Sequence, residues 1–268
     1  MRWSFQNYIM LKSSRKKLIA IGCSYTEDKY EFPVWPTHLA DNLDMDCVNL
    51  GKSGSGNEQI LAKILDTVLT EKNIGLVVVM WSQFQRFDFQ ISDSQWVSLN
   101  PDMHKTNIDW EMKYKDLRSL HNPHSATQNA LRTFIYAENL LKDVPHLFIQ
   151  GPSAFSFYST TTLTTIDCGI GSAFFGHDFY KTNDSERTAA KSFLSSPYFD
   201  YIEDNISKYF VGWPIFTELG GYNVDYILDK VDPERNQLRI SEEDTHPNGK
   251  GHKVITQEIY NAYAKIYT

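Results

Sequence analysis

Three side chains that together can activate a hydroxyl group stand near the two ends of the chain. Ser24 follows an apolar run in LIAIGCSYTED, and Asp244 and His246 lie in DTHPNGKGH. A carboxylate that holds an imidazole in one tautomer makes that imidazole a general base for a hydroxyl nucleophile. Each motif also has a plain structural explanation, as a tight turn or as a helix cap beside a surface histidine. Together they predict that Ser24 is a nucleophile, His246 its base and Asp244 the carboxylate that orients the base.

Cys23 competes with Ser24 as the nucleophile because the two residues are adjacent on the same turn. A thiol in a buried turn behaves as a small apolar side chain. A hydroxyl, in contrast, needs the paired base that Asp244 and His246 supply. We therefore predict that Ser24 attacks the substrate and that Cys23 packs.

Strands and helices alternate along the chain, and these elements must position the reactive side chains. Apolar β-branched runs predict buried strands, and apolar residues spaced three and four apart predict helices. The predicted strands are residues 17–22, 46–50, 74–81 and 146–151, and the predicted helices are 33–43, 58–73, 123–142 and 248–267, with further helical segments between 185 and 210. Because parallel strands need crossover helices, we predict an α/β fold, a three-layer α/β/α sandwich with a mostly parallel central sheet. We expect one domain over residues 1–268, with insertions that lack sustained periodicity at about 83–121 and 153–183.

Polar residues follow three of the predicted strands at their carboxyl ends. Ser24 follows the first strand, the glycine-rich segment GKSGSGN (residues 51–57) follows the second, and Ser82 and Gln83 follow the third. In an open parallel sheet, ligands bind beyond the carboxyl ends of the strands. We therefore expect a site at this edge of the sheet.

Composition and charge limit the partners. The formal net charge of −7 gives no overall attraction to nucleic acid or anionic membranes. No segment approaches the roughly 18 apolar residues of a membrane span, and the first residues lack a secretory apolar core. The default expectation is therefore a soluble, cytoplasmic protein without a membrane partner. The three cysteines, Cys23, Cys47 and Cys168, are too few and too scattered for a disulfide framework or a zinc site. We therefore expect no metal and no cofactor.

Taken in order, these motifs resemble the conserved blocks of the SGNH (GDSL-type) hydrolase family. GCSYT (residues 22–26) is similar to the family's Gly-Asp-Ser block, with Cys23 in place of the aspartate. NLGKSG (residues 49–54) is similar to the block in which an asparagine precedes a glycine, and DTHP (residues 244–247) to the final block. The resemblance implies an SGNH-type α/β fold and catalysis through an acyl-serine.

The resemblance also implies roles for single residues. Ser24 would be the nucleophile, His246 the general base and Asp244 its partner, with Glu243 as the alternative partner because the family often has its aspartate three residues before the histidine. The backbone N–H groups of Ser24 and Gly54 would form an oxyanion hole, with Gly51 as the alternative to Gly54.

The chain departs from the family at the end of the third strand. The family has Gly-x-Asn-Asp there, and the asparagine side chain completes the oxyanion hole; this chain has VVMWSQFQR. Gln83 is the expected substitute, and Ser82 is the alternative. Arg86 and Asn57 are candidate substrate-binding residues, although an ion pair between Arg86 and Asp88 would explain the arginine equally well.

We therefore expect a serine esterase that hydrolyses small acyl esters. The expected substrates are above all O-acetyl groups on a carbohydrate, and the expected partner is accordingly a small-molecule or glycan ester. An O-acyltransferase with the same triad is one alternative. A non-catalytic binding or structural protein on the SGNH scaffold is another, and the missing asparagine favours it. The opening GCSYT is also similar to that of bacterial and phage-encoded SGNH-like proteins, which leaves a viral origin open. The sequence does not predict the oligomeric state.

Overall fold

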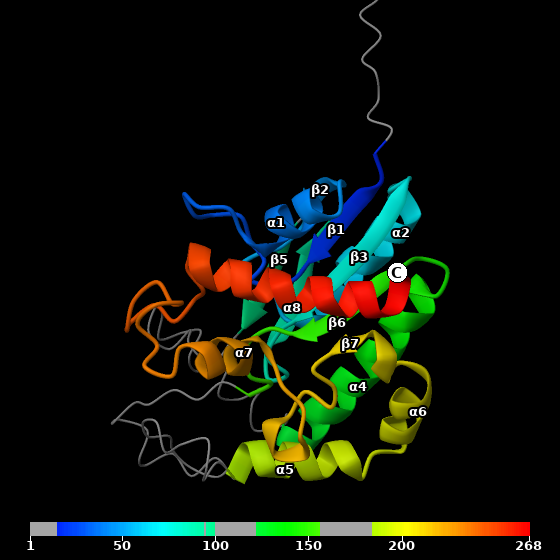
Figure 1. Cartoon of the computed structure of the whole chain (residues 1–268). Coiled ribbons are helices and arrows are strands. Elements are labelled where there is room, and N and C mark those ends of the chain that lie inside the picture. The colour runs from blue at the N-terminus through cyan, green and yellow to red at the C-terminus, as the bar shows by residue number, and fades with distance from the viewer. Residues whose placement is uncertain (1–14, 94, 100–121, 156–183) are drawn as a thin grey trace, which may run out of the picture.

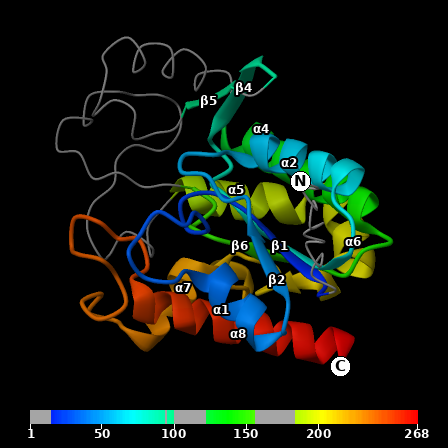
Figure 2. The same ribbon diagram turned by 90° about the horizontal axis from the view of Figure 1, so that it is seen from above.

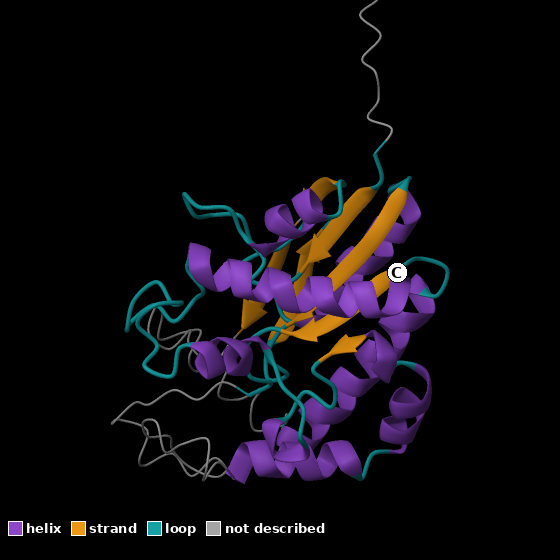
Figure 3. Cartoon of the chain, viewed as in Figure 1, coloured by secondary structure: helices purple, strands orange, loops and turns teal. Residues whose placement is uncertain are grey.

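A parallel sheet of five strands forms the centre of the described part of the chain (Figures 1 and 3). The computed structural model describes residues 15–93, 95–99, 122–155 and 184–268, without the side chains of 184–188. The strands are β1 (Lys17–Ile21), β2 (Asp46–Asn49), β3 (Ile74–Trp81), β6 (His146–Gln150) and β7 (Phe210–Val211). Neighbours in the order β2-β1-β3-β6-β7 are all parallel. Their carboxyl ends therefore lie at one edge of the sheet.

Helices cover both faces of this sheet because both faces are apolar. Leu18 and Ala20 of β1 belong to one buried cluster, whereas Ile19 and Ile21 belong to the other, as the alternation of side chains along a strand requires. The cluster of Ile19 packs against α2 (Asn57–Thr70), α4 (Pro123–Leu141), α5 (Asp184–Leu194) and α6 (Pro197–Asn205), and the cluster of Leu18 packs against α1 (Trp35–Asn42), α7 (Val224–Val231) and α8 (Gly249–Tyr267). Figure 2 shows these two groups on opposite sides of the sheet. The predicted three-layer α/β/α sandwich is confirmed.

Asparagine side chains cap the starts of α4 and α8, as Asn223 caps that of α7. The Asn122 side chain accepts a hydrogen bond from the N–H of Ser125 at the start of α4. Asn248 accepts from the N–H groups of Lys250 and Gly251 at the start of α8. A side-chain oxygen in this position satisfies N–H groups that have no partner inside the helix. The start of α8 bears on the predicted site because DTHP (residues 244–247) and the cap Asn248 lead directly into this helix.

The first insertion contains regular structure that the sequence analysis did not predict. β4 (Phe87–Ser92) and β5 (Gln95–Leu99) form an antiparallel hairpin separate from the main sheet. The segment FDFQIS does alternate between apolar and polar residues, which is a strand signal. Its buried side chain is the polar Asp88, whereas Phe89 and Ile91 are exposed. On β4 only Asp88 is buried, so the alternation of this segment does not mark a face that packs on the core.

The segment expected to be helical between residues 185 and 210 ends in a strand. It contains α5 and α6, then the short turn η3 (Ser207–Tyr209), and β7 pairs with β6. Two residues are too few for a periodic signal, so β7 was missed. Neither η4 (Thr217–Leu219) nor α7 was predicted. Most of the second insertion, residues 156–183, lies outside the described residues.

None of the helices in the described ranges is long and apolar enough to cross a membrane.

Candidate active site

Ser24 lies on a tight turn directly after β1, which we call the nucleophile turn (residues 22–27). The backbone N–H of Thr26 donates to the carbonyl of Cys23 at 2.9 Å. A Cβ atom at Gly22 would lie 2.3 Å from Thr26 Oγ1, so the turn closes only with glycine there. Ser24 is 8% exposed, and its backbone N–H has no hydrogen-bond partner among the described residues.

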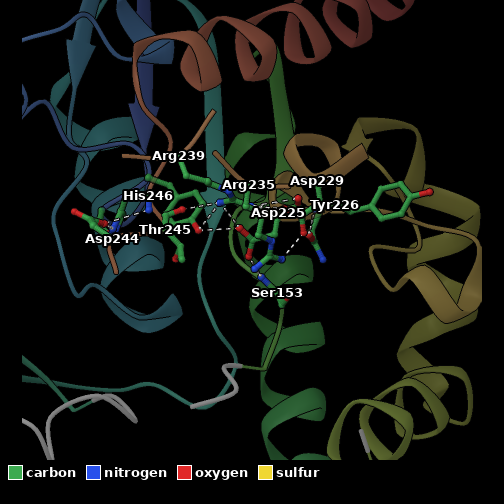
Figure 4. Close-up of polar contacts among 12 residues, drawn as sticks. Ser153, Asp225, Tyr226, Asp229, Arg235, Arg239, Asp244, Thr245 and His246 are labelled. Atoms are coloured by element: carbon green, nitrogen blue, oxygen red, sulfur yellow. Dashed lines mark hydrogen bonds and ion pairs between the residues drawn. The ribbon is translucent and has the colours of Figure 1, made fainter. Parts of the chain in front are cut away.

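Asp244 and His246 lie on a second loop, the base hairpin (residues 238–248), which leads into α8. The N–H of Ile240 donates to the carbonyl of His246 at 2.9 Å, and the N–H of Ser241 donates to the carbonyl of Asp244 at 3.0 Å. These bonds fix both residues on the second half of this hairpin, and Figure 4 shows their side chains in contact.

The nucleophile turn and the base hairpin bring Ser24, His246 and Asp244 into one hydrogen-bonded set. His246 Nε2 lies 2.8 Å from Ser24 Oγ, and His246 Nδ1 lies 2.5 Å from Asp244 Oδ1. Burial alone would raise the pKa of Asp244, but its hydrogen bonds with His246 and the nearby Lys29 lower the pKa overall. An ionised Asp244 accepts a bond from Nδ1–H and leaves Nε2 free to take a proton from Ser24. This geometry can produce a serine nucleophile.

Two alternatives from the sequence stand outside this set. Glu243 accepts a hydrogen bond from Ser241 Oγ at 2.9 Å and does not pair with His246. Cys23 is fully buried in the apolar cluster that packs against α1 and α8. The carboxylate next to the imidazole is therefore Asp244, and the side chain beside Nε2 is that of Ser24.

The loop after β2, which we call the glycine loop (residues 51–56), contains two candidate oxyanion donors. The N–H of Gly51 donates to Asn49 Oδ1 at 2.9 Å, and Asn49 Nδ2 donates to the carbonyl of Thr26 at 2.7 Å. Gly51 is thus used to fasten this loop to the nucleophile turn. Gly54 has a φ of 82°, a conformation that favours glycine, and within the described residues its N–H has no partner. Of the two glycines, Gly54 has the available N–H.

Gln83, after β3, is held by an arginine. Arg86 Nε donates to Gln83 Oε1 at 3.0 Å, and Arg86 Nη1 donates to the carbonyl of Ser55 at 3.0 Å. A guanidinium can only donate, so the amide of Gln83 must present its oxygen to Arg86. The amide NH₂ then faces away from Arg86, and it has no partner in the described part of the chain. Arg86 therefore joins the end of β3 to the glycine loop.

Asn57 and Ser82 support the backbone at the same place. Asn57 Oδ1 accepts from the N–H of Ser82 at 2.8 Å, and Asn57 Nδ2 donates to the carbonyl of Ser82 at 3.3 Å. Ser82 is fully buried, and its Oγ has no partner among the described residues. Arg86 contacts Gln83 and Ser55 rather than Asp88. Asn57 and Arg86 therefore make structural contacts, and Gln83, whose amide NH₂ has no partner among the described residues, is the candidate donor at this position.

The candidate oxyanion donors come from neighbouring strands. β1, β2 and β3 precede the loops that carry Ser24, Gly54 and Gln83, and β1 lies between the other two strands in the sheet. Each of the three contributes an N–H group without a partner among the described residues. Such groups can stabilise the negative charge that forms when Ser24 attacks a carbonyl carbon.

The sequence analysis did not identify Arg239 as part of the site. It lies in QLRISEEDTHP, and its Nη1 donates to the carbonyl of Thr245 at 2.7 Å. The sequence carries no signal for this role, because the acidic partner of Arg239 is Asp225 on α7, and no local pattern of residues links the two. Within the described ranges, no group of three or more His, Cys, Asp or Glu side chains is arranged to hold a metal ion.

Comparisons with known proteins support the fold. No protein-family model and no curated protein matches the sequence. A catalytic mutant of an acetylxylan esterase from Geobacillus stearothermophilus is 13% identical, with a TM-score of 0.50 over 92% of this chain and 93% of that chain. Another variant of the acetyl xylan esterase from this organism is 14% identical, with a TM-score of 0.50 over 92% and 94%. A member of the lipolytic protein G-D-S-L family from Veillonella parvula is 12% identical, with a TM-score of 0.44 over 94% and 98%. At these identities the likeness concerns the fold, and the fold is of the SGNH-hydrolase type.

Proposed function

We propose that this chain, which has an SGNH-type fold, is a serine hydrolase that cleaves ester bonds through an acyl-Ser24 intermediate. One observation carries the proposal: His246 Nε2 lies 2.8 Å from Ser24 Oγ while Nδ1 of the same ring lies 2.5 Å from Asp244. The residues come from opposite ends of the chain and meet in a geometry that general-base catalysis requires. A non-catalytic scaffold would have no need of this contact.

In the first half of the reaction, Ser24 becomes acylated. His246 Nε2 takes the hydroxyl proton as Ser24 Oγ attacks the ester carbonyl carbon, and the C=O bond opens to an oxyanion. The backbone N–H groups of Ser24 and Gly54 and the amide NH₂ of Gln83 donate to this oxyanion. As the tetrahedral intermediate collapses, the C–O bond to the alcohol breaks, and His246 gives its proton to the leaving alkoxide.

In the second half, water replaces the alcohol. His246 takes a proton from the water, whose oxygen attacks the acyl carbon, and the same donors stabilise the second oxyanion. The bond to Ser24 Oγ then breaks, and Ser24 recovers its proton from His246. Asp244 stays ionised throughout and stabilises the imidazolium that forms in each half.

For the substrate, we propose small acyl esters, with O-acetyl groups on a carbohydrate as the natural class. The support is the likeness in fold to an acetylxylan esterase of Geobacillus stearothermophilus. Transfer of the acyl group to a sugar hydroxyl would use the same residues, so the assay should measure acetylated acceptor as well as free acetate.

The direct test is covalent labelling. The protein is incubated with a fluorophosphonate probe and assayed with p-nitrophenyl acetate, beside Ser24→Ala and the matched control Cys23→Ala. We expect Ser24→Ala to abolish labelling and to lower kcat by at least about 10⁴-fold. Cys23→Ala should retain labelling, and mass spectrometry should place the adduct on Ser24.

Two results would contradict the proposal. If the wild-type protein is neither labelled nor active, the chain is not a serine hydrolase. If labelling disappears with Cys23→Ala but persists in Ser24→Ala, Cys23 is the nucleophile and our assignment of Ser24 is wrong. For the substrate class, acetate release from acetylated xylooligosaccharides should exceed turnover of p-nitrophenyl octanoate. The reverse preference would exclude small acyl groups.

A further inference from the structure

A cluster of charged and polar groups joins the base hairpin to α7 (Figure 4). Its centre is Arg239, which is 4% exposed and whose backbone pairs with Pro247. Arg239 Nη1 donates to Asp225 Oδ1 at 2.9 Å and to the carbonyl of Thr245 at 2.7 Å, and its Nη2 donates to Asp229 Oδ1 at 3.0 Å. Thr245 is the residue between the proposed orienting carboxylate and the proposed base. The guanidinium therefore anchors the base hairpin to α7.

Tyr25 connects the same cluster to the nucleophile turn. Its hydroxyl donates to Asp225 Oδ1 at 2.8 Å and accepts from Arg239 Nη1 at 3.3 Å. Its ring lies beside the ring of His246, with centroids 5.2 Å apart. Tyr25 also follows Ser24 directly in the chain. One ion pair, between the buried Arg239 and the part-buried Asp225, is thus bonded to the neighbour of the nucleophile and to the neighbour of the base.

Asp225 is fully occupied in this arrangement. Besides the two bonds to Oδ1, its Oδ2 accepts from the N–H of Ser153, on the loop after β6. Burial by itself would raise the pKa of Asp225, but the charge of Arg239 and the hydrogen bonds from Arg239, Ser153 and Tyr25 lower it overall. Burial raises the pKa of Tyr25, which stays a neutral donor. The carboxylate therefore remains charged and holds three segments together.

Stability alone is a weak explanation for such a cluster. Burying an ion pair removes two charges from water, and well-packed apolar residues of similar size often stabilise a protein as much or more. What an ion pair adds is a defined geometry, because its bonds are directional. Here the directional bonds end on Thr245 and Tyr25, on either side of the 2.8 Å contact between Ser24 Oγ and His246 Nε2.

We propose that Arg239, together with Asp225 and Tyr25, positions the base hairpin against the nucleophile turn and so sets the distance between Ser24 and His246. We call them positioning residues because they would act on Ser24 and His246 through Tyr25 and Thr245, the chain neighbours of those two residues. The inference rests on the proposed function of Ser24 and His246. Small displacements of reacting groups reduce rates strongly, by about 10²-fold for about 1 Å.

The test uses two variants of different severity. Tyr25→Phe removes one hydroxyl and keeps the ring against His246. The double variant Asp225→Leu/Arg239→Met removes the ion pair without leaving one charge buried alone. For each we would measure kcat and KM with p-nitrophenyl acetate, the rate of fluorophosphonate labelling and the midpoint of thermal unfolding. We expect kcat and the labelling rate to fall together, about 10-fold for Tyr25→Phe and about 100-fold for the double variant, with KM little changed.

Glu138→Ala serves as the matched control. Glu138 pairs with the buried His146 at 2.6 Å, at the amino end of β6 and so at the edge of the sheet opposite the site. This variant should have a lower midpoint of thermal unfolding and keep the wild-type kcat. It therefore shows whether a loss of stability alone can lower kcat.

If Tyr25→Phe and the double variant keep wild-type kcat and labelling, the cluster is structural only and the inference is wrong. If the double variant does not fold, Tyr25→Phe decides between the two outcomes. If fluorophosphonate does not label the wild-type protein, the proposed function is wrong, and this inference, which rests on it, is wrong as well.

Discussion

At the scale of single residues, Gln83 is an amide just after β3, where the resemblance to SGNH hydrolases leads us to expect an asparagine. Its side chain has one more rotatable bond, so holding the amide in one orientation costs more conformational entropy. The bond from Arg86 Nε to Gln83 Oε1, at 3.0 Å, offsets that cost by fixing the amide oxygen. The NH₂ group remains available as a donor because an arginine cannot accept a hydrogen bond. The longer side chain is therefore compatible with a working oxyanion hole.

The first prediction concerns this donor. Replacing Gln83 by alanine should lower kcat for p-nitrophenyl acetate by about 10²- to 10³-fold and change KM little, because the oxyanion exists only in the transition state and the intermediates. The exposed Gln90, replaced by alanine on β4, provides a control that should keep wild-type kinetics. A Gln83→Ala variant with wild-type kcat would assign the third donor to another group.

At the scale of elements, the β4–β5 hairpin supports the loops of the site from outside the main sheet. Gly56 precedes α2 and has no side chain with which to cap it. Asp88 of β4 accepts the N–H groups of Gly56 and Gln59 at 2.9 Å each, and so supplies a cap from another element. A carboxylate at a helix N-terminus also interacts favourably with the helix dipole. Asp88 and Arg86 thereby attach the hairpin to the glycine loop and to the end of β3.

This arrangement predicts that Arg86 acts through Gln83. Arg86→Met should lower kcat about 10-fold, and the double variant with Gln83→Ala should be no slower than Gln83→Ala alone. A double-mutant cycle of kcat/KM for p-nitrophenyl acetate measures this coupling. Effects that simply add would show that Arg86 works separately from Gln83, for example by contacting the substrate.

At the scale of the whole molecule, α8 closes one face of the sandwich and carries a buried histidine. His252 is fully buried, and its Nδ1 accepts the N–H of Trp35 at 3.2 Å, at the start of α1. Val34, which precedes α1, provides no side-chain cap, so α8 satisfies this N–H instead. Burial, followed by the nearby His38 and His246, lowers the pKa of His252 to about 3. The folded protein therefore holds this ring neutral.

A dependence of stability on pH follows from this pKa. An unfolded histidine has a pKa of about 6.5, so between about pH 6.5 and pH 3 the unfolded chain binds one proton more at this position than the folded chain. The contribution to stability is complete above pH 6.5 and decreases as the pH falls, by up to about 1.4 kcal/mol per pH unit. Urea unfolding of wild type at pH 7 and pH 5 should show this loss, and His252→Gln should lose about 2 kcal/mol less.

The exposed His124, replaced by glutamine, is the matched control for that experiment and should keep the wild-type pH dependence. If wild type and His252→Gln lose the same free energy of unfolding between pH 7 and pH 5, the histidine is not held neutral in the core.

The sequence by itself determined the class of fold and the pieces of the candidate site. The strands before Ser24 and Ser82 are continuous apolar runs, and the helix after Asn248 has a cap and a regular spacing of apolar residues. These signals are local, since they depend on residues a few positions apart, so they can be recognised without the fold. The chemistry suggested by Ser24 and DTHP is of the same local kind.

Only the tertiary structure decided which groups meet. It placed Asp244 rather than Glu243 beside His246, and it used the N–H of Gly51 within the protein, whereas the N–H of Gly54 has no partner among the described residues. It also added β7, a strand of two residues that exists because β6 offers it an edge. Each of these outcomes depends on hydrogen bonds between segments distant in sequence. Residue types and spacing do not specify such partners, because the partners become neighbours only when the sheet assembles.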